Sequence, residues 1–269
     1  MRLLTLNCHS WQEKQPLEKL NQIVQQILAQ DYDVIALQEV SQLMDTPIVY
    51  DDVRNDNFAY LIQQALKEQG QTYSLVWDFA HIGYDKYEEG LALLTKHPIL
   101  KSDSYYVSRS QDTFDWKSRK IVRATIQVDG TPITFNTCHL GWWADEVEPF
   151  QEQFNHLIAR MDPLEWTFFL GDFNNDALER NTGYDYMMQR GLHDVFLLAK
   201  ETVGIETING NIDGWEDNQQ GLRIDLVLSN RKIDVERVGV VFDGIHGPVV
   251  SDHYGVEVDI QIQKMNIKY

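Results

Sequence analysis

The chain has 269 residues, of which 41 are acidic and 23 basic, so its formal net charge at pH 7 is −18. A surface this acidic repels polyanions and offers no basic stripe for a phosphate backbone, which argues against nucleic acid as a partner. No apolar run reaches the roughly 18 residues that a membrane-spanning helix needs, so no membrane association is expected.

The first third of the chain alternates strand and helix patterns. Residues 2–8 and 33–40 are apolar runs typical of buried strands. Residues 16–30 lie between them and have the periodicity of an amphipathic helix, with Pro16 in its first turn. Residues 56–70 predict a second helix.

The middle of the chain has several strand-like runs in close succession, and one tight turn signal. Asp129-Gly130 predicts a hairpin between the last two of these runs. The predicted strands are 72–79, 90–96, 120–128 and 132–140.

The second half repeats this plan. Residues 146–161 predict a helix and 166–173 a buried strand, followed by a less regular stretch. The chain then closes with predicted strands at 222–230, 233–243 and 253–263. This order predicts an α/β fold in which two sheets pack together with helices outside.

Neither a linker nor an internal repeat interrupts the pattern, so we expect one domain over residues 1–269. Cys8 and Cys138 both lie in apolar runs, which indicates reduced, buried thiols and a cytoplasmic protein. The N-terminal apolar run is too short for a secretory signal and lacks a small-residue cleavage site.

Several apolar strands end on polar residues that a core cannot hold without partners. Taken singly, each is more often a structural residue than a functional one. Together they offer oxygen ligands suited to Mg²⁺, and no HxxxH or CxxC spacing indicates zinc. The set is Asn7, Glu39, His139, Asp172, Asn174, Asp225, Asp252 and His253.

Six segments resemble, in chain order, the signatures of the endonuclease/exonuclease/phosphatase superfamily: LTLNCHS, ALQEV, NTCHL, LGDFN, RIDLVL and SDH. GDFN alone would be a weak signal, but GDFN followed downstream by SDH is specific. The resemblance implies a DNase I-like fold, a four-layered α/β/β/α sandwich of two mixed sheets. It also implies metal-dependent phosphoester hydrolysis by in-line attack of an activated water, without fixing the substrate.

The resemblance assigns metal binding to three of these residues. Glu39 matches the family's main Mg²⁺ ligand, and Asn7 and Asp252 match further residues around the metal. Mn²⁺ is an alternative to Mg²⁺, and the number of ions is left open.

The resemblance also assigns the catalytic residues. Asp172 and Asn174 match the pair that orients the attacking water and holds the phosphate. Asp225 and His253 match a carboxylate–histidine dyad. His139 matches a second histidine, which steadies the phosphoryl oxygens or assists the leaving group.

Four further residues are placed less directly by the resemblance. Arg119 lies where nuclease members have a phosphate-contacting arginine, and Glu89 lies where some members have an acid that orients His139. His9 and Trp11 depart from the family's pattern, and they either close the pocket or pack.

Trp142 and Trp143 are adjacent, so on extended backbone they face opposite sides. A single tryptophan more often packs in a core, but at least one of these points away from it, close to the predicted catalytic histidine. Such a ring could stack on the apolar face of a sugar or a base.

The remaining sequence favours a small phosphorylated sugar as the substrate. The acidic surface disfavours DNA, the missing secretory signal disfavours sphingomyelin, and the scarcity of basic residues disfavours inositol polyphosphates. LTLNCHSWQE, VWDFAHIGYDKYEEG and CHLGWWADEVEPF are similar to a bacterial subgroup that includes maltose 6'-phosphate phosphatase. This similarity implies a sugar pocket shaped by His81, Tyr84, Trp142 and Trp143.

Two alternatives stay open. A phosphodiesterase, either a DNase I-like nuclease or a sphingomyelinase-like enzyme, would use the same catalytic residues on a diester. A non-catalytic binding module is disfavoured, because none of the catalytic residues is missing.

Overall fold

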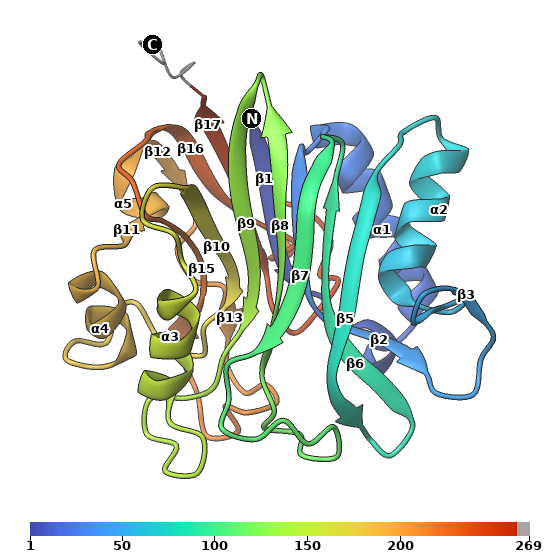
Figure 1. Ribbon diagram of the computed structural model, residues 1–269, viewed down its shortest axis with the longest axis horizontal. Coiled ribbons are helices and arrows are strands. Elements are labelled where there is room, and N and C mark those ends of the chain that lie inside the picture. The colour runs from blue at the N-terminus through green and yellow to red at the C-terminus, as the bar shows by residue number, and fades with distance from the viewer. Residues whose placement is uncertain (263–269) are drawn as a thin grey trace.

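The computed structural model describes residues 1–262, which form two β-sheets packed face to face with helices on both outer sides (Figure 1). This four-layered α/β/β/α arrangement confirms the predicted fold class. Within the described residues, the strands of the first sheet are, in order, β12 (Ala199–Val203), β16 (Asp234–Val241), β17 (Gly255–Gln261), β1 (Arg2–Asn7), β2 (Val34–Leu43), β6 (Tyr87–Thr95) and β5 (Ser74–Gly83). Those of the second sheet are β11 (His193–Asp194), β15 (Asp225–Ser229), β10 (Trp166–Asp172), β9 (Thr131–His139), β8 (Lys120–Val128) and β7 (Ile99–Tyr106).

The helices and short strands lie outside these two sheets or at their ends. The helices are η1 (Ser10–Gln12), α1 (Pro16–Gln30), α2 (Phe58–Glu68), α3 (Phe150–Ala159), α4 (Gly183–Gln189) and α5 (Val195–Leu198). Two short hairpins are formed by β3 (Ile48–Tyr50) with β4 (Val53–Arg54), and by β13 (Ile208–Asn209) with β14 (Gly221–Leu222).

Alternation along the strands divides the apolar side chains between the layers. On β1, Leu3 faces the second sheet, whereas Leu4 faces α1 and α2. On β10, Phe168 lies between the sheets and Phe169 packs under α3 and α4. Burying a side chain of this size contributes about 1.5–3 kcal/mol, so each outer layer is held to its sheet by its own apolar cluster.

The helix ends follow local chemistry. The predicted helix at residues 16–30 is confirmed with both its bounds. The second helix begins at Phe58, because the Asn57 side chain accepts a hydrogen bond from Tyr60 N and caps it. The third begins at Phe150, later than predicted, because Pro149 occupies the N-cap with extended backbone.

The predicted hairpin at Asp129-Gly130 is confirmed, with Val128 opposite Thr131. Strand β7 escaped prediction because it lies at the edge of its sheet and buries only one of its eight residues fully, which hides the apolar pattern. The elements from α4 to β14 were missed because they are short. The last residue of the predicted strand 253–263 lies outside the described residues.

Both cysteines are free and buried, as predicted. None of the helices in residues 1–262 is long and apolar enough to cross a membrane. A single domain over residues 1–269 stays a prediction.

Candidate active site

The first sheet supplies one wall of the site through the ends of two parallel strands. Pairing of β1 with β2 puts Asn7 beside Gln38, next to Glu39. The Asn7 amide donates to Glu39 Oε1 at 2.8 Å and to Asp172 Oδ2 of the second sheet at 3.2 Å. This one side chain therefore joins the catalytic ends of both sheets.

The second sheet supplies the opposite wall, because β10 lies between β9 and β15. Its last residue, Asp172, pairs with His139 on one side and with Asp225 on the other. His139 Nε2 lies 3.6 Å from Asp172 Oδ2 and 3.9 Å from Glu39 Oε1. Three predicted catalytic residues are thus neighbours by strand register alone.

His253 and Asp225 form the predicted dyad. His253 Nδ1 lies 2.9 Å from Asp225 Oδ2, and its Nε2 lies 3.7 Å from Asp172 Oδ2. Burial lowers the pKa of His253, but the charges of Asp225 and Asp172 outweigh this and raise it to about 10. The dyad is therefore poised to hold positive charge on the imidazole.

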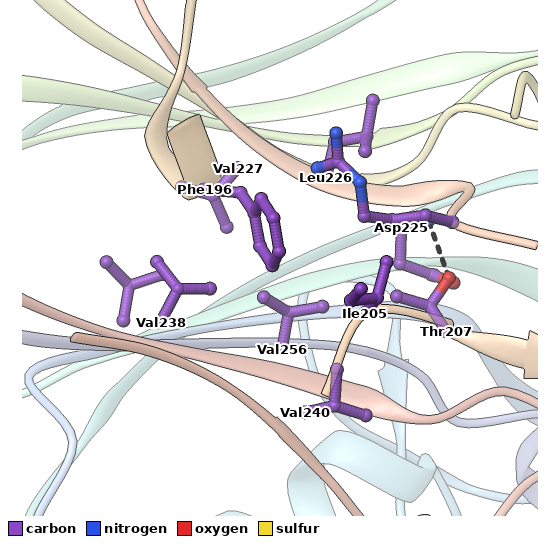
Figure 2. Close-up of a pocket in the computed structure, with 11 residues that line it drawn as sticks. Phe196, Ile205, Thr207, Asp225, Leu226, Val227, Val238, Val240 and Val256 are labelled. Carbon is purple, nitrogen blue, oxygen red and sulfur yellow. Dashed lines mark hydrogen bonds between the residues drawn. The ribbon is translucent and has the colours of Figure 1, made fainter. Parts of the chain in front are cut away.

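Asp225 is shielded from water by an apolar pocket (Figure 2), whose lining includes Phe196, Val240 and Val256. Its backbone N–H donates to Thr207 Oγ1 at 3.0 Å. Because the carboxylate is 1% exposed, its interaction with the imidazole is little screened by solvent.

Glu39 has the surroundings of a metal ligand. It sits at a β-bulge, where the register of β2 shifts between Leu37 and Val40, and its φ of 53° is in the left-handed region. Burial and the nearby charge of Glu89 raise the pKa of Glu39 to about 8. A bound cation would stabilise a carboxylate that has so little positive charge near it. Backbone strain of this kind is typical of functional sites.

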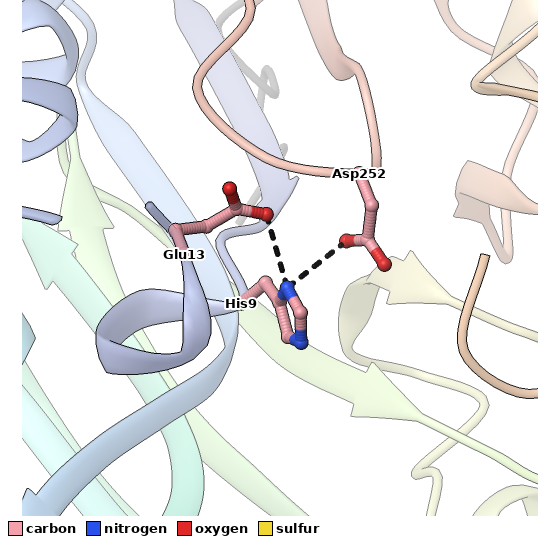
Figure 3. A group of neighbouring side chains, drawn as sticks. All are labelled: His9, Glu13 and Asp252. Atoms are coloured by element: carbon pink, nitrogen blue, oxygen red, sulfur yellow. Dashed lines mark hydrogen bonds and ion pairs between the residues drawn. The ribbon is translucent and has the colours of Figure 1, made fainter. Parts of the chain in front are cut away.

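Asp252, the third predicted metal ligand, lies beside His9 and Glu13 (Figure 3). His9 Nδ1 is 3.0 Å from Glu13 Oε1 and 3.6 Å from Asp252 Oδ1. Trp11, by contrast, packs edge-on against Phe58. Of the two residues left open by the sequence, His9 therefore belongs to the edge of the site and Trp11 to a core.

Asp172 is buried among titratable groups. Burial raises its pKa and the positive charge of His253 lowers it, while Asp225 adds a further increase, so that the pKa of Asp172 is about 7. A carboxyl group with this pKa can exchange a proton near neutral pH.

Asn174 is held through its backbone N–H and through both polar atoms of its side chain. Its φ is 49°, and its backbone N–H donates to Asp172 Oδ1 at 2.8 Å. Its amide donates to Leu140 O at 2.9 Å, and its Oδ1 accepts from Trp215 Nε1 at 2.9 Å. Trp215 lies outside the signature segments, in the irregular stretch before RIDLVL, so no motif pointed to it.

Arg119 is the buried cation of the site. It is 4% exposed, and its Nε has no hydrogen-bond partner within residues 1–262. Its Nη1 reaches only the Trp116 carbonyl oxygen, at 3.5 Å, and its guanidinium lies 5.8 Å from the Trp142 ring centre. Buried donors without acceptors are rare in folded proteins, so an anionic ligand at this position is expected.

His81 is held by Glu89, which the sequence had linked to His139. His81 Nε2 lies 3.3 Å from Glu89 Oε1, and the Gln12 amide donates to Glu89 Oε2 at 3.0 Å. Burial raises the pKa of Glu89, but the hydrogen bond from His81 and the charges of His81 and Arg119 together more than offset it, and the pKa falls below its usual value. The structure thus gives Glu89 a different histidine from the predicted one.

A cavity of about 550 Å³, within the roughly 300–1,000 Å³ of small-molecule sites, connects part of the site to the surface. The predicted site residues that line it are Glu39, His81, Tyr84, Arg119, His139, Trp142, Asp172, Asn174 and His253. Its inner end consists of buried or partly buried side chains that include Glu39, Arg119 and His253. We call its exposed lining residues the mouth: Tyr84, Asp85, Phe114, Trp116, Asp213, Gly214 and Glu216.

The two adjacent tryptophans lie in different surroundings. Trp142 lines the cavity and lies edge-on to Trp116, with ring centres 6.2 Å apart. Trp143 packs instead against Phe150 and Tyr186, under α3 and α4. Only Trp142 is therefore positioned as a wall of the cavity.

Tyr84 lies at the mouth, 61% exposed, and its hydroxyl donates to Asp213 Oδ2 at 3.2 Å. Sequence reasoning did not name Asp213 or its neighbour Glu216 as site residues, because they come from the irregular stretch before β14. Phe114 and Trp116, 76% and 54% exposed, were missed for the same reason in the loop before β8.

Comparisons with known proteins agree with this geometry. A family model described as "Endonuclease/Exonuclease/phosphatase family" matches residues 4–253. An endonuclease/exonuclease/phosphatase family protein from Leptotrichia buccalis is 33% identical, over 97% of this chain and 100% of that one, with a TM-score of 0.92. No curated protein matches the chain.

Two more distant structures share the fold. A mannosyl-6-phosphatase from Bacteroides thetaiotaomicron is 17% identical, over 97% of this chain and 100% of that one, with a TM-score of 0.71. TDP2 from D. rerio, complexed with a single-strand DNA product, is 16% identical, over 97% and 99% of the two chains, with a TM-score of 0.67.

Proposed function

We propose that the chain, which belongs to the endonuclease/exonuclease/phosphatase family, is a divalent-metal-dependent phosphomonoesterase that acts on a sugar phosphate such as maltose 6'-phosphate. Members of the family are phosphoester hydrolases and generally depend on divalent metals. The choice of a monoester with a neutral sugar body rests on the cavity.

The observation that supports this choice is that the charged residues of the cavity differ between its inner end and its mouth. The inner end holds Arg119 with its unsatisfied Nε, while the mouth holds Asp85, Asp213 and Glu216. Among the described lining residues, the mouth contains no lysine or arginine. One phosphate is therefore favoured inside, and a second phosphate would meet three carboxylates at the mouth.

A sugar fits the mouth by its chemistry. Carboxylates accept hydrogen bonds from hydroxyl groups, and the exposed rings of Trp116 and Phe114 offer faces for the apolar side of a pyranose. Trp142 extends this aromatic wall toward the inner end. A mannosyl-6-phosphatase has the same fold, so the fold is compatible with a sugar phosphate as the substrate.

The residues present fit a hard divalent cation such as Mg²⁺ or Mn²⁺. Glu39, Asn7 and Asp252 would hold it, since their oxygen donors suit such an ion and the raised pKa of Glu39 marks a carboxylate without a compensating charge. When bound, the ion supplies positive charge that offsets charge building up on the phosphoryl oxygens.

Proton transfer falls to Asp172 and the dyad. Asp172, with a pKa of about 7, accepts the proton of the attacking water near neutral pH. Asp225 accepts from Nδ1 of His253, which fixes the orientation of the ring and leaves Nε2 directed toward Asp172. The imidazolium so stabilised balances the negative charge of the reacting phosphate.

His139 and Arg119 serve the phosphate. Burial and the charge of Arg119 lower the pKa of His139 well below its ordinary value, so the imidazole is neutral and can donate one hydrogen bond to a phosphoryl oxygen. Preorganised donors of this kind typically stabilise a transition state by about 2.7–4 kcal/mol each.

The test is hydrolysis of a panel of substrates with Mg²⁺, and with EDTA as a control, measured as inorganic phosphate from the monoesters, as p-nitrophenol from the bis-ester and as strand cleavage of DNA. The panel contains maltose 6'-phosphate, glucose 6-phosphate, p-nitrophenyl phosphate, its bis-ester and single-stranded DNA. We expect EDTA-sensitive release from the sugar phosphates. Cleavage of only the bis-ester or DNA would leave the metal site in place and reject the proposed substrate in favour of a phosphodiesterase.

A further inference from the structure

We infer that Trp215, on the loop of residues 210–220 between β13 and β14, is a positioning residue for the catalytic amide of Asn174. Its indole N–H donates to Asn174 Oδ1 at 2.9 Å. The inference rests on the proposed function, together with the role that the family resemblance assigns to Asn174, which with Asp172 orients the attacking water and holds the phosphate.

The contacts of Asn174 fix the orientation of its amide. Its oxygen faces the Trp215 indole, while its nitrogen donates one of two N–H groups to Leu140 O at 2.9 Å. The second N–H is left for a ligand in the cavity, which Asn174 lines. Rotating the amide by half a turn would break both contacts and present an oxygen to the phosphate.

The indole is the donor that satisfies this buried oxygen. Asn174 is 4% exposed. Without Trp215, its Oδ1 would be a buried acceptor with no hydrogen-bond partner, which is destabilising. The backbone of Asn174 is already held in a left-handed conformation, with φ of 49°. Strained backbone persists only where neighbouring contacts hold it, and Trp215 supplies one of these contacts.

Trp215 is itself well anchored. Its backbone N–H donates to Ile212 O at 3.0 Å, and its ring packs on a small apolar cluster that includes Ile208 and Ile224. Ile224 precedes the catalytic Asp225, and its carbonyl oxygen accepts from Phe173 N at 3.0 Å. The indole is thus fixed to the same strands that carry the catalytic carboxylates.

The same loop forms part of the mouth. A Cβ on Gly214, whose φ is +82°, would lie 2.5 Å from Trp142 Cζ2, so the loop backbone is in close contact with that ring. Asp213 accepts from the Tyr84 hydroxyl across the mouth. Trp215 therefore links the part of the cavity assigned to the sugar with the amide assigned to the phosphate.

The first test is Trp215→Phe, which keeps an aromatic ring and removes the N–H together with part of the indole. We expect kcat to fall by about ten- to a hundredfold on both maltose 6'-phosphate and p-nitrophenyl phosphate, with KM within about twofold of wild type. Trp166→Phe is the matched control, because Trp166 is buried at the opposite end of β10 and its Nε1 has no partner in the described residues. Unchanged kcat in Trp215→Phe would overturn the inference.

The second test separates positioning from a general structural role. Asn174→Ala is compared with the double variant Asn174→Ala/Trp215→Phe, with every rate normalised to the folded fraction from thermal unfolding. If Trp215 acts through Asn174, the double variant is no slower than Asn174→Ala alone. Multiplying effects would overturn the inference.

Failure of the proposed function gives a different result. In that case wild-type protein does not release phosphate from sugar phosphates. The rates of wild type, Trp215→Phe, Asn174→Ala and the double variant are then compared on whichever ester of the panel the protein does cleave. The expected non-additivity of Trp215 and Asn174 is then unchanged.

Discussion

Asp172 and Asp225 lie opposite each other on neighbouring strands, yet their contacts suit different tasks. Asp225 has its carboxylate against His253 and apolar side chains behind it. Asp172 faces two histidines and the Asn7 amide, and its pKa of about 7 suits exchange of a proton. We infer that Asp225 orients the imidazole and that Asp172 titrates.

Removing either member of the dyad should slow turnover without weakening binding. We expect His253→Ala and Asp225→Asn each to lower kcat by about 10²- to 10⁴-fold with little change in KM, because proton transfer and imidazole orientation matter in the transition state. Steady-state kinetics on p-nitrophenyl phosphate measures this.

His97→Ala is a matched control for the dyad. His97 also pairs with a carboxylate, Asp33, at 2.8 Å, but at the opposite end of the first sheet. Its loss should leave kcat unchanged. Near-normal turnover by folded His253→Ala protein would show that the dyad is not part of the mechanism.

The two tryptophans should differ in what their loss changes. Trp142→Ala should raise KM for maltose 6'-phosphate more than for p-nitrophenyl phosphate, because Trp142 lines the cavity next to Trp116. Trp143→Ala should instead lower Tm with little effect on KM, because this ring packs against Phe150. Equal changes in KM on both substrates for Trp142→Ala would argue against a role in binding the sugar.

At the scale of elements, the sequence predicted the strands whose ends form the site. The strands ending at Asn7, His139 and Asp172 are long, buried and apolar, so each shows as a clear run followed by a polar residue. Their convergence follows from strand pairing, which local pattern does not reveal. The family resemblance supplied this non-local information for the catalytic residues.

The loops around the mouth were beyond sequence reasoning. Trp215 matters because its N–H meets Asn174, 41 positions away along the chain. Asp213 meets Tyr84, 129 positions away. Neither contact leaves a periodic pattern or a motif, so the catalytic end of the cavity could be predicted and its mouth only in part.

The end of β10 depends on a glycine. Gly171 has φ of +142°, and a Cβ there would lie 2.0 Å from the Cys138 carbonyl oxygen of β9. We expect Gly171→Ala to cost about 1–3 kcal/mol of stability, as overpacked sites do, which is several degrees in Tm for a domain of this size. Thermal unfolding measures the effect.

Gly191→Ala separates the clash from backbone strain alone. Gly191 also has a positive φ, of +83°, but nothing lies within 4 Å of its added Cβ. The Gly191→Ala variant should therefore lose clearly less stability than Gly171→Ala. If the two variants lose equal stability, close packing between β9 and β10 is not what requires the glycine.

At the scale of the whole molecule, the formal charge of −18 and the cluster of carboxylates at the site act together. Repulsion among them disfavours the compact state, and a divalent cation held at the site relieves it locally. Any salt screens the overall charge, whereas only a specific ion should depend on Glu39.

Mg²⁺ should therefore raise Tm beyond the effect of ionic strength. A site filled at about 100 times its Kd adds about 2.7 kcal/mol to the free energy of unfolding, or several degrees in Tm. The measurement is thermal unfolding in MgCl₂ and in NaCl at equal ionic strength, for wild type and Glu39→Gln. Equal shifts in both salts for wild type would contradict a specific metal site.

The fold by itself leaves the substrate open, since a sugar phosphatase and a DNA-bound TDP2 share its architecture. A diester carries a second alcohol group on the phosphate, where a monoester has a free, charged oxygen. In the proposed function the inner end with Arg119 receives that charged oxygen, and the sugar meets the mouth, with its rings and its carboxylates Asp85, Asp213 and Glu216.

The most direct measurement is the ratio of kcat/KM for maltose 6'-phosphate to kcat/KM for bis(p-nitrophenyl) phosphate, with Mg²⁺ and again with EDTA. We expect a ratio far above one with Mg²⁺ and no turnover of either ester with EDTA. A ratio below one, with cleavage of the diester still sensitive to EDTA, would contradict the assignment as a sugar-phosphate monoesterase and identify a phosphodiesterase instead.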